Sequence, residues 1–463
     1  MSDQTALEEK PEDETEDDYA LRDRVVNAAV EAARAGERAQ LEEVFEPLHP
    51  ADIADLLEQV EIDDRNAILK LAGDYIDGEI LSEIDEDIRD SVIEALEPEV
   101  LAGAVRELES DDVVDLIEGL DTEQQGAIIE VLDVVDRIAV EQALSYPEYS
   151  AGRLMQREVV IAPEHWNVGD AIDHMRAQDD LPEQFYHIIL VDPRHRPTSY
   201  VTLGRLMSSR REVKLSDITE ESFRTFDVTE DEGDVAYAFN QYHLISAPVV
   251  DEEGRLVGII TIDDAMAILD EEHEEDVLRL GGVGDESLSN STLEIVKRRF
   301  PWLAVNLATA ILASLVISIF EDVLAAVVAL AVLMPIVASM GGNAGTQSMT
   351  VAVRSIATRD LTAANAFRVI RREAGAGLLN GFIFAVVMGI VGLVWFGQPM
   401  IGVVIAVAMV INLLAAGLAG VLIPIVLDRF KIDPALASGT FVTTVTDVVG
   451  FFAFLGLASM VLL

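Results

Sequence analysis

The stretch MPIVASMGGNAGTQSMT, residues 334–350, lies inside a long apolar run, yet it contains a proline, three glycines, an asparagine, a glutamine and several hydroxyls. In hydrocarbon every backbone polar group must be satisfied, so an irregular segment is tolerated there only against protein or a water-filled cavity. Asn343 and Gln347 are four residues apart and share one face of a helix, where their amides could hold a hydrated solute. A kinked helix with a small-residue packing seam would need the glycines but not both amides. The stretch therefore favours a pore lining.

The charges are divided unevenly between the two parts of the 463-residue chain. Residues 297–463 hold 7 acids and 10 bases, whereas residues 1–296 hold 76 acids and 22 bases. A very acidic soluble part is thus joined to an apolar, slightly basic part. Phosphate binding needs the opposite sign of charge, so we expect no nucleic-acid partner.

Five lysines and no cysteine accompany this acidity, a composition that suggests a halophile's cytoplasm, where acidic surfaces keep proteins soluble in concentrated salt. Solubility in salt also explains most of the carboxylates of the first part without any further function. Disulfides, thiolate metal sites and cysteine nucleophiles are excluded because cysteine is absent. The acidic, polar N-terminus shows no cleavable signal peptide.

The soluble part shows two patterns after an acidic tail, residues 1–18, that we expect to be disordered. Residues 19–150 have helical periodicity broken by polar turns about every dozen residues, which predicts stacked helical hairpins in a small superhelical domain. From 151 to 272, two copies of strand, helix, two strands, helix follow each other. The second copy, APVVDEEGRLVGIITIDDAM (247–266), resembles a cystathionine-β-synthase (CBS) domain, and residues 190–207 resemble it more weakly.

Residues 297–463 are predicted to be an all-α polytopic membrane domain with five transmembrane helices, joined to the CBS pair by a connecting helix at 273–296. We expect spans at residues 301–319, 323–348, 374–395, 400–427 and 435–461. All lysines and arginines of this domain precede the first span or lie in the second-to-third and fourth-to-fifth connections. The positive-inside rule then predicts a cytoplasmic N-terminus and a C-terminus outside.

Asp447 lies midway along the fifth predicted span, where an ionised carboxylate is costly and usually functional. A buried salt bridge would be the ordinary explanation, but none of the five spans contains an internal Lys, Arg or His. The partner is then water, a neutral donor, a proton or a cation. Hydroxyls of Thr443, Thr444 and Thr446 stand nearby. We favour a cation path over a structural, neutral aspartic acid.

The same segments resemble the MgtE family of magnesium channels and transporters. The resemblance rests on PIVASMGGNAGTQS (335–348), RSIATRDL (354–361), RREAGAG (371–377), DPAL (433–436) and TDVVG (446–450). LHPADIADLLEQV (48–60) and SYPEYSAGRLM (145–155) resemble the family's helical N-domain and its junction with the CBS pair. The Gly-Gly-Asn-x-Gly-x-Gln pattern together with an aspartate in the fifth span is highly specific.

This resemblance implies a homodimer in the membrane lipid with a Mg²⁺ path between the protomers. Asp447 matches the family's pore carboxylate, Thr443 a nearby backbone oxygen and Asn343 an amide of the second span. Glu373 and Asp433 match acids near the inner mouth, although ordinary helix-end chemistry explains Glu373 equally well. Mg²⁺ prefers octahedral oxygen ligands and dehydrates reluctantly, which suits a path lined by amides, carbonyls and two symmetry-related carboxylates.

The resemblance also implies gating by cytoplasmic Mg²⁺ bound between acidic faces of the N-domain, the CBS pair and the connecting helix. The positions that match its sensor are Asp264, Glu272, Glu275, Asp276 and, less closely, Asp231. Ala267, Gly233 and His243 stand where the family pattern can carry acids, so the ligand set here can be smaller or different.

Two alternatives remain open at this point. One is a carrier for another divalent ion such as Co²⁺ or Mn²⁺, or a proton-coupled carrier that uses Asp447 as its relay. The other is a membrane-tethered nucleotide sensor, because Thr261 and Asp264 form a Thr-x-x-Asp pattern that can hold the ribose and phosphate of ATP or AMP in CBS modules. No nucleophile–base set or phosphate-cradling loop is evident, so an enzyme is not expected.

Overall fold

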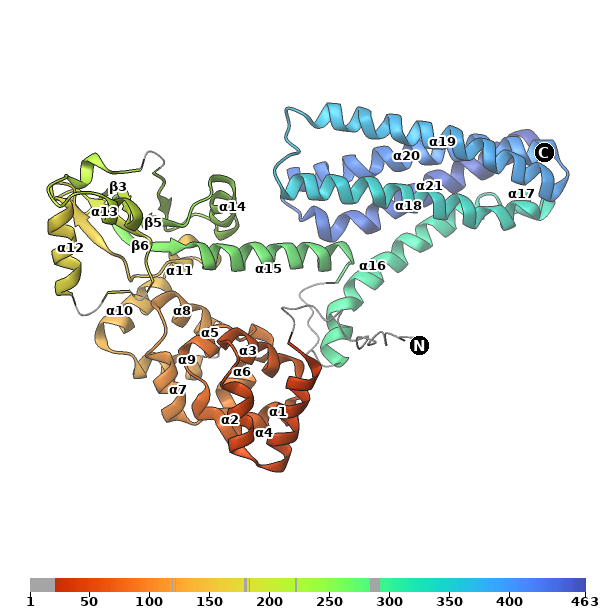
Figure 1. The fold of residues 1–463 in the computed structure, drawn as a ribbon. Helices are drawn as coiled ribbons and strands as arrows, with labels where there is room; N and C mark the ends of the chain where they lie inside the picture. Colours follow the sequence, from red (N-terminus) through yellow and green to blue (C-terminus); the bar gives the residue numbers. More distant parts are fainter. Residues whose placement is uncertain are drawn as a thin grey trace, which may run out of the picture. The chain divides into compact units, whose positions relative to one another are not determined.

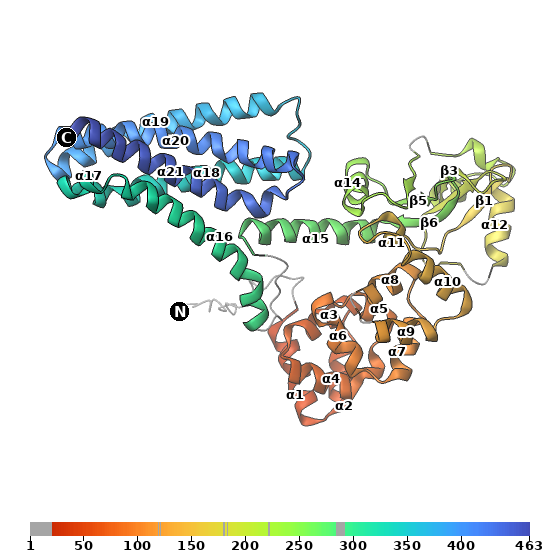
Figure 2. The ribbon, with the colours of Figure 1, turned by 180° about the vertical axis from the view of Figure 1, so that it is seen from behind.

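The computed structural model describes residues 21–118, 120, 122–178, 181–182, 184–220, 223–283 and 292–463. The predicted acidic tail and residues 284–291 of the predicted connecting helix lie outside these residues. The chain divides into two compact units, residues 1–271 and 272–463, and each is considered by itself below. Figures 1 and 2 show the helices and strands of both units from opposite sides.

The N-terminal part of the first unit consists of short helices joined by tight turns, as the periodicity predicted. Most helices begin with acidic residues in their first turn, which suits the positive end of a helix dipole. Leu41, Leu56, Leu81 and Ile117 are fully buried in one continuous apolar core. The helices are α1 (Asp23–Ala35), α2 (Arg38–Phe45), α3 (Pro50–Gln59), α4 (Ile62–Ala72), α5 (Gly78–Ser82), α6 (Glu86–Ala95), α7 (Pro98–Val105), α8 (Ser110–Glu118), α9 (Thr122–Val131) and α10 (Val134–Ala143), with a 3₁₀ turn at Gly73–Tyr75.

Arginines, of which Arg65 and Arg89 are buried and Arg137 is half-buried, hold the helix ends together at a regular interval of 24 residues along the chain. The Nε of Arg65 donates to the Leu57 carbonyl at 2.7 Å. The Nε of Arg89, 24 residues later, donates to the Ile84 carbonyl at 3.3 Å. Two intervals further, the Nε of Arg137 donates to the Ile129 carbonyl at 3.1 Å. Midway between Arg89 and Arg137, where the same spacing would place another arginine, stands Val113, which is buried and apolar. The N-domain therefore consists of repeated hairpins, of which the third lacks its arginine.

The two CBS copies have the predicted order of elements. In each copy the first strand pairs parallel with the second, which pairs antiparallel with the third. Each sheet has three strands, in the orders β1-β2-β3 and β4-β5-β6. After α11 (Ala151–Leu154), the first copy comprises β1 (Ile161–Pro163), α12 (Val168–Ala177), β2 (His187–Val191), β3 (Pro197–Thr202) and α13 (Leu203–Ser208). After a 3₁₀ turn at Leu215–Asp217, the second comprises β4 (Phe226–Asp227), α14 (Glu232–Tyr242), β5 (Ser246–Val250), β6 (Leu256–Thr261) and α15 (Ile262–Leu280).

The described part of the second unit contains five helices that are long and apolar enough to cross a membrane. They are α16 (Thr292–Ser318), α18 (Ala329–Ala357), α19 (Ala366–Phe396), α20 (Pro399–Arg429) and α21 (Pro434–Leu462). The second span was predicted to begin at residue 323, and this start is wrong. A separate short helix, α17 (Glu321–Ala326), comes first, because the chain leaves helical geometry at Val327.

α18 is one continuous helix despite Pro335 and the three glycines, so the irregular backbone expected at 334–350 does not occur. The glycines instead allow close packing. A Cβ on Gly345 would lie 2.6 Å from a methyl of Val442 in α21, and a Cβ on Gly420 of α20 would lie 2.6 Å from the Gly345 carbonyl oxygen. α20 contacts α18, α19 and α21, and these four helices run side by side in Figures 1 and 2.

Candidate functional site

One face of α18 carries a row of polar side chains that point away from the rest of the second unit. This polar stripe consists of Ser339, Asn343, Thr346, Gln347 and Thr350, all of which are exposed. On the opposite face Gly341 and Gly345 are buried against the neighbouring helices. Within the stripe, the Asn343 amide donates to the Ser339 hydroxyl at 3.3 Å. The predicted pair of amides thus shares a face with further hydroxyls that sequence reasoning did not single out.

Asp447 lies on α21, one turn after Thr443, and its side chain is half-buried. No hydrogen bond or ion pair joins its carboxylate to any residue that the structure describes. The neighbouring hydroxyls are already used by the helix: Thr443 donates to the Gly439 carbonyl and Thr446 to the Thr443 carbonyl, each at 3.0 Å. Both oxygens of the Asp447 carboxylate thus remain for a cation, and the threonine hydroxyl and carbonyl oxygens keep lone pairs beside these bonds.

A second group of charges lies at the N-terminal end of α21, which Asp433 caps. This side chain caps α21 by accepting from the Ala435 N–H at 2.7 Å, and it lies 3.4 Å from Nη1 of Arg279. Arg279 also pairs with Glu275 at 2.6 Å. Burial, followed by the nearby Asp433, raises the pKa of Asp276. The structure thus brings together three predicted acids around an arginine that the sequence analysis did not consider.

Glu373 forms the link between two membrane helices near that end. The Ser348 hydroxyl of α18 donates to Glu373 of α19 at 3.0 Å, and Arg372 lies 3.1 Å from the same carboxylate. The carboxylate therefore has both a hydrogen bond and an adjacent positive charge. This environment suits the structural reading of Glu373 as well as the functional one.

The first unit contains a cluster of carboxylates between α8 and the start of α15. Asp264 is partly buried and accepts from the Thr261 hydroxyl at 2.5 Å. Burial, with further repulsion from Asp263 and Asp112, raises the pKa of Asp264 to about 7. Burial and surrounding acids likewise raise the pKa values of Glu109 and Asp112 to about 7, and that of Asp111 well above its ordinary value. We call Glu109, Asp111, Asp112, Asp263 and Asp264 the α8–α15 acid cluster.

The sequence analysis missed the α8 members of this cluster because it attributed most acids of this part of the chain to solubility in salt. One signal was available in the sequence. Arg65, Arg89 and Arg137 fit a regular spacing, and the position in this spacing that falls on α8 is Val113 instead of an arginine. Ser110 joins the same helix to the CBS pair: its hydroxyl donates to Glu158 and accepts from the Arg157 N–H, each at 2.8 Å.

Two other predicted sensor residues have different surroundings. Asp231 caps α14, where its carboxylate accepts from the Asp234 N–H at 3.3 Å. Glu272 is exposed on α15. Among the described residues, no three acidic or histidine side chains converge closely enough to hold a metal ion. Any metal between the acids would therefore need these side chains to move together.

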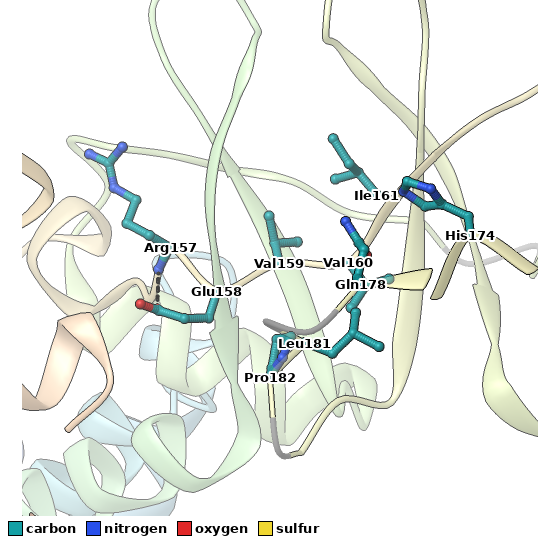
Figure 3. Close-up of a pocket in the computed structure, with 9 residues that line it drawn as sticks. All are labelled: Arg157, Glu158, Val159, Val160, Ile161, His174, Gln178, Leu181 and Pro182. Atoms are coloured by element: carbon teal, nitrogen blue, oxygen red, sulfur yellow. Dashed lines mark hydrogen bonds between the residues drawn. The ribbon is translucent and has the colours of Figure 1, made fainter. Parts of the chain in front are cut away.

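Two hollows lie near the first CBS sheet. The larger, about 230 Å³, lies between β1 and the end of α12 and is lined by His174, Gln178 and Ile161 (Figure 3). In Figure 3 the Arg157 side chain points away from this hollow, while its backbone N–H donates to Glu158. The smaller hollow borders Thr261, His187 and Ser246 and has room for about 10 Å³, roughly one water molecule. A nucleotide at Thr261 would therefore require this hollow to open.

A CBS pair joined to five apolar helices, with a polar stripe and an intramembrane carboxylate, defines a polytopic membrane protein of the ion-transport class. Known sequence families match this arrangement in the same order. The MgtE intracellular N domain matches residues 48–149, CBS domains match 151–212 and 215–271, and MgtE, described as a divalent cation transporter, matches 334–457.

Individual relatives agree. The magnesium transporter MgtE of Thermus thermophilus is 33% identical over 449 residues, which cover 96% of this chain and 99% of the relative. The magnesium transporter MgtE of Bacillus subtilis is 31% identical over 69% of this chain and 71% of its own. The chain therefore belongs to the MgtE family, whose members named here are transporters and not enzymes. A solved cytosolic domain of the Mg²⁺ channel MgtE in complex with ATP is 28% identical and covers 52% of this chain and 99% of its own, with a TM-score of 0.48.

Proposed function

We propose that this protein is a homodimeric transporter that moves Mg²⁺ across the cytoplasmic membrane through a channel-like path, and that cytoplasmic Mg²⁺ closes this path. The relatives of Thermus thermophilus and Bacillus subtilis that carry the name magnesium transporter support the choice of ion. Co²⁺ and Mn²⁺ are the competing divalent ions, and a proton-coupled carrier is the competing mode.

The polar stripe on α18 is the observation that carries the proposal. Lipid cannot satisfy amides and hydroxyls, so a membrane helix does not expose a continuous polar face to hydrocarbon. Asn343 and Gln347 are nevertheless exposed in the single chain. A second copy related by two-fold symmetry would cover this face and leave a polar path between the protomers. The dimer and the pore thus follow from one requirement.

Mg²⁺ suits the oxygen atoms that such a path would offer. The ion holds its water strongly, so a conducting path binds the hydrated ion through oxygens that contact its water molecules instead of stripping them. Two symmetry-related Asp447 carboxylates would supply the negative charge, while the Asn343 amide and the Thr443 carbonyl would accept from the ion's water. Glu373 and Asp433 would attract cations towards one end of the path.

Gating would use the acids outside the membrane spans. With no divalent ion, the α8–α15 acid cluster and the group of Glu275, Asp276 and Asp433 repel internally. Mg²⁺ bound between them would remove this repulsion and draw their helices together, with Glu272 and Asp231 as further ligands. An ion that binds with a millimolar dissociation constant supplies only about 4 kcal/mol of binding free energy per site. Several sites would therefore have to act together to close the path.

The positive charges support the sidedness of this arrangement. Lys297 precedes the first membrane helix, Arg371 and Arg372 lie at the start of the third, and Lys431 lies between the fourth and fifth. All of these positions fall on one side of a five-helix path, which the positive-inside rule makes cytoplasmic. The acidic first unit would share that side, and the C-terminus would lie outside.

Mg²⁺ uptake by proteoliposomes with Asp447→Asn tests the path. The substitution keeps the side chain's shape and removes one charge per protomer, so uptake should fall steeply while the oligomer still assembles. Crosslinking measures the assembly, and uptake of Co²⁺ and Mn²⁺ in parallel tests the choice of ion. An Asp447→Asn protein that takes up Mg²⁺ at the wild-type rate would overturn the assignment of the path.

Replacing Asp264, Glu272, Glu275 and Asp276 together by their amides tests the gate. Closure should then require more Mg²⁺ than after any single replacement, as measured by the loss of flux on raising internal Mg²⁺. Protection from proteolysis that does not change between zero and tens of millimolar Mg²⁺ would contradict gating by this ion.

Nucleotide binding at the CBS pair is the second candidate function. Its support is Thr261, which borders the smaller hollow and whose hydroxyl donates to Asp264. A ribose or phosphate of ATP or AMP would have to take this hydroxyl from Asp264 and widen the hollow. Titration of the full chain with ATP and AMP, with Thr261→Val as the comparison, tests it. Equal binding by both proteins would exclude this site.

A further inference from the structure

Asn412 is a fully buried amide in the middle of α20, between α18 and α21. Its exposed fraction is 0%. The Nδ2 atom donates to the Val337 carbonyl of α18 at 2.7 Å. The Oδ1 atom is buried and has no hydrogen-bond partner among the described residues. A buried amide with an unused acceptor costs free energy within a membrane.

The amide occupies a slot between two glycines on different helices. A Cβ on Gly341 of α18 would lie 2.3 Å from Nδ2 of Asn412, and a Cβ on Gly450 of α21 would lie 2.9 Å from the same atom. Neither helix could approach so closely with any larger residue at these positions. The flat carboxamide therefore touches the backbones of both helices at once.

Packing alone does not require an amide in this slot. Leucine branches at the same carbon and has the same number of side-chain heavy atoms, none of them polar. What leucine lacks is the directional bond to the Val337 carbonyl. In helical assemblies a single buried asparagine can fix the register of its neighbours at a cost in stability.

We propose that Asn412 is a positioning residue, which sets the register of α18 against α21 and thereby the relative depth of Asn343 and Asp447. Gly341 comes two residues before Asn343, and Gly450 comes three residues after Asp447. Asn412 touches both glycines, so it connects the two segments that carry the polar groups of the proposed Mg²⁺ path. This inference rests on that path.

The test compares Asn412→Leu, Asn412→Asp and Met409→Ala in proteoliposomes, with the initial rate of Mg²⁺ uptake measured against Mg²⁺ concentration. Loss of one hydrogen bond corresponds to about a fivefold change in an equilibrium constant. Asn412→Leu should therefore raise the half-saturating Mg²⁺ concentration by about fivefold or more. A neutral aspartic acid has the shape of asparagine and keeps one donor, so Asn412→Asp should restore a value near that of the wild type.

Met409→Ala is the matched control, because Met409 is also fully buried on α20 and its truncation leaves a cavity. It should lower the melting temperature and the amount of folded transporter without changing the half-saturating concentration. An unchanged half-saturation in Asn412→Leu, or an equal increase in Met409→Ala, would overturn the positioning role.

Further variants keep the inference testable if Asn412→Leu does not fold. Gly450→Ala keeps Asn412 itself, but its added methyl group displaces the Asn412 amide from the slot. Gly375→Ala on α19 is the comparison, because its methyl group has nothing within 4 Å. Only Gly450→Ala should raise the half-saturating concentration; equal behaviour of the two would refute the role of Asn412. Asp447→Asn separates the two proposals: if it abolishes uptake while both slot variants match the wild type, only the inference about Asn412 fails.

Discussion

Nη1 of Arg279 lies 3.4 Å from a carboxylate oxygen of Asp433, the residue that caps α21. The same guanidinium pairs with Glu275, so one arginine serves two acids. Asp276 lies in the same group, and Asp433 contributes to the rise in its pKa. A fixed cation thus occupies the position where a bound divalent ion would neutralise the same charges.

Replacing Arg279 by glutamine should make this group depend on added cations. Without the guanidinium, Glu275, Asp276 and Asp433 repel each other, and partly exposed pairs of this kind contribute about 0.5–1 kcal/mol. We expect a lower melting temperature in EDTA and a larger increase on adding Mg²⁺ than in the wild type. Arg255→Gln removes an exposed pair with Asp251 and is the control. Equal responses to Mg²⁺ in the two variants would contradict the prediction.

The contact between α8 and α15 should weaken as the pH rises. Glu109, Asp112 and Asp264 have pKa values of about 7 in the folded contact, whereas exposed carboxyls titrate near 4. The folded contact therefore binds more protons than the open one between pH 4 and pH 7. The stability of the contact is highest below pH 4, falls as the pH rises, and is lowest once the pH has passed 7. Each proton involved corresponds to about 1.4 kcal/mol per pH unit.

Hydrogen exchange of residues 110–118 in the full chain measures this effect. After correction for the intrinsic exchange rate, protection in EDTA should be lower at pH 8 than at pH 6, and Mg²⁺ should restore it at pH 8. Asp115 and Glu158, which lie next to the cluster, repel it in the same sense. Asp264→Asn should flatten the dependence. If the corrected protection in EDTA is equal at pH 6 and pH 8, the raised pKa values do not control the stability of this contact.

Val113→Arg should partly replace the Mg²⁺ that we propose to bind at the α8–α15 acid cluster. The substitution puts a guanidinium at the repeat position of Arg89 and Arg137, next to Asp111 and Asp112. Proteolytic protection of the full chain should then appear at several-fold lower Mg²⁺, provided that the new guanidinium finds carbonyl partners as Arg89 does, since one charge pair contributes on the order of 1 kcal/mol. Val113→Met has a similar length without charge. If Met has the same effect as Arg, charge is not the cause.

Gly420→Ala should destabilise the membrane helices. Its Cβ would lie 2.6 Å from the Gly345 carbonyl oxygen and 2.8 Å from Cβ of Ser348, so α20 must move away from α18. Overpacking of this kind costs about 1–3 kcal/mol and should lower the melting temperature by several degrees. Gly342→Ala on α18 meets nothing within 4 Å and should change little. A similar loss in both proteins would indicate an effect of glycine replacement alone.

Several parts of the fold could be predicted from the sequence because local patterns determine them. The period-two strands around the Asp251–Gly254 turn and the long apolar runs indicated the CBS copies and the five membrane helices. The start of α18 was missed because residues 323–328 are as apolar as the span itself. The break at Val327 has no signal in hydropathy.

The candidate site was less predictable, since it depends on contacts between distant segments. Asp447 and Asn343 are conspicuous as polar residues in apolar runs. By contrast, Glu109 and Asp112 resemble the other acids of a very acidic chain, and only the fold places them beside Asp264. Arg279 was overlooked for a related reason: its partner Asp433 is far away in the sequence.

The regular arginines of the N-domain also affect how that domain comes apart. Arg65 donates to Ser91, and Arg89 donates to Asp115, so each arginine fastens its own hairpin to the next one along the chain. In such an array cooperativity passes only between neighbours and is lost first at the weakest junction. Val113 marks that junction. The helices before it and those after it should therefore open as two separate units of hydrogen exchange, with the boundary at the hairpin that bears the acids.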